Sequence, residues 1–83
     1  MDIDTIRKRL IIRSWRRGTK ELDLILGKFS NNNVSKLEMA ELDLYERLIS
    51  NDDHVIYGWL FEREESPEIF YKLIKRIQEG MYQ

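Results

Sequence analysis

The chain has 83 residues, 42% of them hydrophobic and 35% charged, and a formal net charge of −1. We expect a single domain over residues 1–83 with a small core, because a chain this short buries only about 60–65% of its unfolded surface. The absence of cysteine excludes disulfides, thiolate metal sites and thiol nucleophiles. The aliphatic runs are as short as Leu24-Ile25-Leu26, so no membrane insertion is expected.

The apolar residues recur with helical spacing nearly throughout the chain. This periodicity predicts an all-α protein, a compact bundle of about five short helices at roughly 4–15, 19–30, 36–49, 53–63 and 67–80. The faces expected to enter the core are Leu22, Ile25, Leu26 and Phe29 in the second helix, Leu37, Ala40, Leu44 and Leu48 in the third, Ile56, Trp59 and Leu60 in the fourth, and Ile69, Leu73, Ile74 and Ile77 in the fifth.

Two helix starts are predicted from capping patterns. Ser35 and Glu38 have the spacing of a capping box, flanked by Val34 and Met39 at hydrophobic-staple spacing, so we expect Ser35 to cap the third helix. The sequence Ser66-Pro67-Glu68 predicts a serine cap followed by a proline in the first turn of the fifth helix.

Charge is unevenly spread along the chain. Residues 1–20 hold seven basic and two acidic groups, whereas the remaining 63 residues hold seven basic and thirteen acidic ones. An anionic partner for the basic end would explain this asymmetry, and so would pairing of that end with the acidic remainder of its own fold. The charges alone leave both interpretations open.

No group of residues has the pattern of a catalytic site. His54 is the only histidine and has no partner at metal-ligand spacing, so an exposed or capping role is expected. Glu41 is expected to reach solvent and Trp59 to lie in the core, whereas Trp15 could either pack or offer a stacking surface. We therefore do not expect an enzyme.

The stretch Arg16-Arg17-Gly18-Thr19-Lys20-Glu21-Leu22-Asp23 concentrates charge around a glycine. A left-handed turn at Gly18 and a helix start at Glu21 and Asp23 would explain the glycine and the acids. They would not explain the basic groups at the positive end of that helix. A surface with both donors and acceptors, fixed by a tight turn, suits recognition of another protein.

The sequence resembles the succinate dehydrogenase assembly factor family, the flavinators that promote covalent attachment of FAD to the flavoprotein subunit. The motif Arg-Gly-x-x-Glu-x-Asp is intact at residues 17–23. A second similar stretch comprises Glu46-Arg47-Leu48-Ile49, Asp52-Asp53 and Trp59-Leu60. Val55 departs from the pattern, because an acid is common there in the family.

The resemblance implies a five-helix bundle that binds the flavoprotein subunit of succinate dehydrogenase and acts as a chaperone, not as the catalyst. The FAD would belong to the partner, with no cofactor in this chain, and service to fumarate reductase is left open. The implied partner-binding residues are Arg17, Gly18, Glu21 and Asp23, and we extend this surface to the neighbouring Arg16, Arg13 and Arg9.

Two alternatives of other classes remain at this point. The basic first helix with Trp15 could dock on nucleic acid, although a pI near 5.8 and the acids Glu21 and Asp23 argue against it. The chain could also be an adaptor for another protein. The acidic opening Met1-Asp2-Ile3-Asp4 is unlike a signal peptide, so we expect a complete, soluble, cytoplasmic protein.

Overall fold

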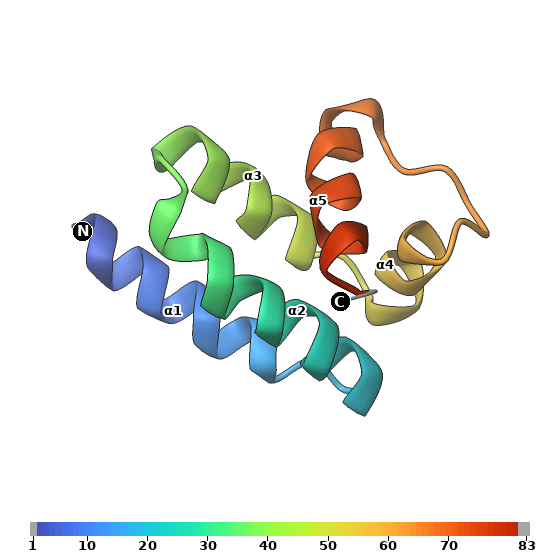
Figure 1. Ribbon diagram of the computed structural model, residues 1–83, viewed down its shortest axis with the longest axis horizontal. Helices are drawn as coiled ribbons and strands as arrows, with labels where there is room; N and C mark the ends of the chain where they lie inside the picture. The colour runs from blue at the N-terminus through green and yellow to red at the C-terminus, as the bar shows by residue number, and fades with distance from the viewer. Residues whose placement is uncertain (1, 82–83) are drawn as a thin grey trace.

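The computed structural model describes residues 2–81, which form five α-helices and two short 3-10 turns and contain no β-strand. The elements are α1 (Ile3–Trp15), α2 (Lys20–Asn33), η1 (Val34–Lys36), α3 (Met39–Ile49), α4 (Asp53–Leu60), η2 (Glu68–Phe70) and α5 (Tyr71–Met81). The first two helices lie antiparallel, α3 runs alongside them, and α4 and α5 complete the bundle (Figure 1). The predicted all-α bundle is confirmed.

The starts of α1 and α2 follow local capping chemistry. The Asp2 carboxylate accepts a hydrogen bond from the Thr5 amide at 2.9 Å, and this amide holds the pKa of Asp2 below its usual value. The Thr19 hydroxyl accepts from the Leu22 amide at 3.3 Å. Glu21 and Asp23 then occupy the first turn of α2, as predicted, where acids complement the helix dipole.

The predicted cap at Ser35 is wrong. Ser35 is exposed within η1, and α3 begins only after Glu38, whose amide donates to Glu41 at 3.3 Å in a capping box three residues further along. Burial of Leu37 explains the shift, because its extended backbone carries it into the core and interrupts the helix there. Met39 is 51% exposed and forms no staple.

The fifth helix also begins later than predicted. Pro67 has an extended backbone and precedes η2, so it does not occupy the first turn of a helix. Ser66 makes no capping bond to an amide there. The α-helix itself begins at Tyr71.

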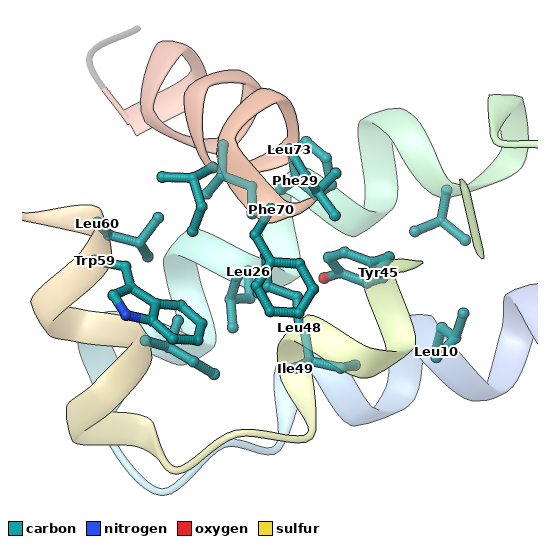
Figure 2. Packing of buried hydrophobic residues seen from close by; sticks show 14 of the residues in the cluster. Leu10, Leu26, Phe29, Tyr45, Leu48, Ile49, Trp59, Leu60, Phe70 and Leu73 are labelled. Atoms are coloured by element: carbon teal, nitrogen blue, oxygen red, sulfur yellow. The ribbon is translucent and has the colours of Figure 1, made fainter. Parts of the chain in front are cut away.

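One core joins all five helices, and Figure 2 shows its centre. The predicted faces of the second and fourth helices enter it, although Ile25 is only half-buried.

The prediction for the core face of the third helix is wrong in part, because Ala40 is exposed and Leu44 half-buried. The interruption after Leu37 changes the phase of α3. In the fifth segment Phe70 is buried in place of Ile69. The residues that fill the core from α3 are Leu42, Tyr45, Leu48 and Ile49.

Two aromatic residues have defined packing roles. Trp59 is buried and its ring lies 5.6 Å from that of Phe70, which confirms the core prediction for this residue. Trp15 lies against Gly27, where an added Cβ would meet the indole ring, and its Nε1 donates to Asn31 at 3.2 Å. Trp15 is therefore a packing residue that requires a glycine on the adjacent helix.

Candidate functional site

The turn between α1 and α2 is held against the connection between α3 and α4, and Arg17 makes this contact. Its side chain is only 11% exposed. Nε donates to Asp53 Oδ1 at 3.0 Å, Nη2 donates to the Asn51 carbonyl at 3.0 Å, and Nη1 donates to the Ile49 carbonyl. We call Arg17, Asp53 and the two carbonyl groups the turn clamp. Figure 2 shows the α3–α4 connection passing beside this turn.

Asp23 holds the same turn from the other side. Its carboxylate accepts a hydrogen bond from the backbone amide of Arg17, and the side chain is half-buried. The motif therefore folds back on itself: its last residue fixes the backbone of its first, while the clamp fixes the side chain. Such a turn has little freedom to change its orientation.

Gly18 does not have the left-handed backbone that its position predicted, since no described glycine has a positive φ. The reason for glycine is a close approach. A Cβ at position 18 would lie 2.8 Å from Asp53 Oδ2, closer than real Cβ contacts come. Gly18 is itself exposed, so the turn presents bare backbone to solvent.

Glu21 differs from the other charged members of the motif, because its side chain is exposed. It borders a groove of about 790 Å³ between α2 and α5, whose lining includes Leu24, Phe29 and Met81. Leu24, one turn along the same helix, is 43% exposed. A carboxylate beside an exposed leucine, next to a fixed turn, is an arrangement suited to binding another protein.

The arginines of α1 are largely engaged within the fold. Arg9 and Arg13 lie 3.1 and 2.9 Å from Glu46 Oε2, and Arg13 also donates to Ser50 at 3.2 Å. Arg16 is exposed and makes no ion pair within residues 2–81. The pairing with Glu46 and Asp53 supports the interpretation that the basic end faces acids of its own fold, and it weakens the nucleic-acid alternative.

A second hollow, of about 520 Å³, lies between the turn and α4. Thr19, Asp53, His54 and Tyr57 are among the residues that line it. His54 is exposed, as predicted, and the described residues contain no cluster of three or more potential metal ligands. The same residues include no helix long and apolar enough to cross a membrane.

Buried polar groups beneath the site were not anticipated from the sequence. The Tyr45 hydroxyl lies 2.6 Å from Ser14 Oγ, which donates to the Leu10 carbonyl at 2.7 Å. Burial raises the pKa of Tyr45 to about 12, although the Ser14 hydrogen bond and nearby Arg17 oppose the shift. The helical spacing of Tyr45 with Leu42, Leu48 and Ile49 was the available signal.

The sequence of residues 8–81 matches the family model described as "Flavinator of succinate dehydrogenase". The chain is 36% identical over 78 residues to "Succinate dehydrogenase assembly factor 2, mitochondrial" of Dictyostelium discoideum, a match that covers 93% of this chain and 55% of that protein. It is 30% identical over 76 residues to "FAD assembly factor SdhE" of Legionella pneumophila, which covers 92% of this chain and 96% of the relative.

A third relative, "Succinate dehydrogenase assembly factor 2, mitochondrial" of Lodderomyces elongisporus, is 40% identical over 57 residues, or 69% of this chain and 35% of that protein. The chain thus spans about half or less of the length of these mitochondrial relatives, and nearly all of the Legionella protein.

Proposed function

Because the chain belongs to the family of succinate dehydrogenase flavinators, we propose that it binds the flavoprotein subunit of that enzyme and promotes covalent attachment of FAD to it. The observation that carries the proposal is the environment of Glu21, an exposed acid held beside a turn that is fixed from two sides. The chain acts as an assembly factor, and the FAD belongs to its partner. We place this step in the cytoplasm.

The motif residues have two different roles: some fix the shape of the turn and others contact the partner. Arg17 and Asp23 shape the turn from within, because the guanidinium and the carboxylate already have partners in the fold. Gly18 presents backbone and Glu21 a carboxylate, which can form charge-assisted hydrogen bonds with partner donors. Arg16 is an exposed cation at the edge of this surface.

Arg13 and Arg9 contribute at its periphery. Both guanidinium groups share the carboxylate of Glu46, so part of their charge is already neutralised. Their direct contribution to binding is expected to be smaller than that of Glu21.

The mechanism we propose is a shift in the conformations of the flavoprotein. Bonding of a histidine to the flavin requires both groups to be held in register, and such alignment can lower a barrier by several kcal/mol. A partner that binds this arrangement preferentially raises its population, by no more than its differential affinity. The flavinator then needs no nucleophile and no FAD site of its own.

The test is to co-express the flavoprotein subunit with the wild-type chain or with Glu21→Ala, and to measure covalent flavin by fluorescence of the denatured flavoprotein. We expect Glu21→Ala to reduce flavinylation strongly while its melting temperature changes little, because an exposed acid in a first helical turn contributes only about 0.3–1 kcal/mol. The matched control is Asp4→Ala, which removes an exposed first-turn acid from α1 together with its 3.4 Å ion pair to Arg7. Normal flavinylation with Glu21→Ala would overturn the proposed role.

A second experiment tests whether the chain is an assembly factor and not the acceptor of FAD. Incubated alone with FAD, the purified protein should acquire no covalent flavin, because no described nucleophile is paired with a base. Flavin fluorescence that persists on the denatured chain itself would contradict the proposal.

A further inference from the structure

Asp53 lies at the start of α4, 30 residues or more from the motif in the sequence, yet both of its carboxylate oxygens face the motif turn. Oδ1 lies 2.9 Å from Arg17 Nη2 and accepts from Arg17 Nε at 3.0 Å. Oδ2 occupies the space that a side chain at position 18 would need. One carboxylate therefore constrains two consecutive residues of the turn.

The clamp depends on this carboxylate for its charge. The Ile49 and Asn51 carbonyls accept hydrogen bonds from Arg17 but carry no formal charge. Within residues 2–81, Asp53 is the one carboxylate paired with the Arg17 guanidinium, and the two side chains are 11% and 27% exposed. A cation this buried is held poorly without a counter-charge, so loss of the Asp53 charge should weaken the contact between the turn and the start of α4.

The identity of residue 18 follows from the same contact. The backbone of Gly18 has no positive φ and would accept an alanine on conformational grounds. The obstacle is the 2.8 Å approach to Asp53 Oδ2. The glycine of the motif and the acid of α4 are thus complementary: the carboxylate fills the place that a larger residue 18 would take.

We infer that Asp53 is a positioning residue for flavoprotein binding. It sets the orientation of the turn relative to Glu21 and α4, and it does so through Arg17 and Gly18. This inference rests on the proposed function. It implies that the binding surface is built by two segments distant in sequence, the motif turn and the start of α4, with the 520 Å³ hollow between them.

The test measures the affinity of the purified full chain for the apo-flavoprotein subunit of succinate dehydrogenase by calorimetry, at a temperature where every variant is folded. Asp53→Asn keeps the size of the side chain and removes its charge. We expect it to weaken binding by about tenfold, within the range of about 5–150-fold that is typical when one site changes the affinity of another. Tyr45→Phe is the control, because it removes a buried hydroxyl that bonds α3 to Ser14 of α1, without reaching the surface. It should lower the melting temperature and change the affinity less than about twofold.

A double-mutant cycle separates the effect of Asp53 on the position of residue 18 from its effect on the stability of the fold. Gly18→Ala should weaken binding in the wild-type background, because its methyl group displaces the Asp53 carboxylate. In the Asp53→Ala background that collision is absent, so Gly18→Ala should have less than about a third of its original effect, a coupling expected only for residues in contact. Equal effects in both backgrounds would mean that residue 18 meets the partner directly, and would overturn the inference.

The remaining outcomes distinguish this inference from the proposed function. Unchanged affinity in Asp53→Asn, together with loss of binding in Glu21→Ala, overturns the positioning role and leaves the proposed function standing. A wild-type chain that does not bind the flavoprotein overturns both. If Asp53→Asn does not fold, Asp53→Glu takes its place: it keeps the charge but lengthens the side chain beside Gly18, and unchanged affinity would again overturn the inference.

Discussion

The Glu46 cluster joins α1 to α3, and the turn clamp joins the turn after α1 to the start of α4; both use arginine–carboxylate pairs, but they differ in burial. In the clamp, the Arg17 side chain is 11% exposed and also reaches two backbone carbonyls. In the Glu46 cluster, defined by Glu46 with Arg9 and Arg13, the arginine side chains are 41% and 36% exposed. The same residue types thus form a desolvated, multiply bonded contact in one place and a solvated one in the other.

The difference in burial separates the arginine that the fold requires from those that it can lose. A buried guanidinium with several acceptors cannot be removed without leaving groups unsatisfied, whereas water replaces much of a half-exposed pair. The two regions lie on one short segment of α1 and its following turn. Arg16 lies between the two regions, is exposed, and has no ion pair among the described residues. Its replacement therefore gives the reference value for an arginine that does not stabilise the fold.

The largest expected effect belongs to Arg17→Ala. It leaves Asp53 and two carbonyl groups without their donor. We expect the free energy of unfolding to fall by about 2–4 kcal/mol, which lies between the cost of one unsatisfied polar group, about 1–3 kcal/mol, and that of a broken buried ion pair, about 3–5 kcal/mol. Urea denaturation followed by circular dichroism measures this change. Arg17→Lys should recover only part of the loss, because an ammonium cannot reproduce the planar fork. Full recovery by lysine would show that charge alone holds the turn.

The helices were predictable because their signal is local, whereas the clamp is not local. Periodicity placed Leu22, Leu26 and Ile56 correctly in the core, since each helix repeats its face every turn. Arg17 and Glu21 look alike in sequence, as charged residues near a glycine. They differ because residues 49–53 lie beside the turn in the fold: Arg17 bonds to this segment and is buried, whereas Glu21 remains exposed.

The errors at Ser35 and Gly18 have the same origin. In both, a pattern with a sound local explanation was overridden by a tertiary contact: the burial of Leu37 moved the cap to Glu38, and the Asp53 carboxylate replaced a left-handed backbone as the reason for glycine. The partner-binding role of Glu21 remains a prediction.

The next largest expected effect is the loss of stability on ionisation of Tyr45 at high pH. It tests how deeply this side chain is buried beside the clamp. Its pKa of about 12 in the folded state lies above the ordinary value of 10.0. The fold therefore favours the neutral phenol, and the resulting stability is present below pH 10 and is lost as pH rises toward 12. The loss should reach about 2–3 kcal/mol, as linkage requires for a shift of this size.

Tyr45→Phe is the matched variant, because phenylalanine does not titrate. Urea midpoints compared at pH 9 and pH 11.5 should show a steeper loss for wild type than for Tyr45→Phe. At pH 9 the wild type should be more stable by about 1 kcal/mol, the usual contribution of a hydrogen bond such as that to Ser14. Parallel pH profiles would show that Tyr45 is less buried than the structure has it.

Disruption of the Glu46 cluster should lower the free energy of unfolding by less than disruption of the turn clamp. Glu46→Gln removes the carboxylate shared by Arg9 and Arg13, and we expect a loss of about 1 kcal/mol or less at low salt. Screening should reduce the difference from wild type at 1 M NaCl, where the Debye length is about 3 Å. Denaturation in urea at both salt concentrations provides the test. A salt-independent loss as large as that of Arg17→Ala would remove the distinction between the two regions.

Arg16→Ala should have the smallest effect on stability and completes the series. Its side chain is exposed and has no ion pair among the described residues, so the free energy of unfolding should change by less than about 0.5 kcal/mol.

Because the Arg16 side chain remains available at the edge of the proposed surface, its removal should act mainly on the rate at which the chain meets the flavoprotein. We expect a lower association rate at low salt and little change in the dissociation rate, as for charges at the rim of an interface. Stopped-flow or surface-binding kinetics at two ionic strengths would measure this. An Arg16→Ala variant that loses stability comparably to Arg17→Ala would mean that burial does not rank these arginines, whereas unchanged association kinetics would confine the surface to Gly18 and Glu21.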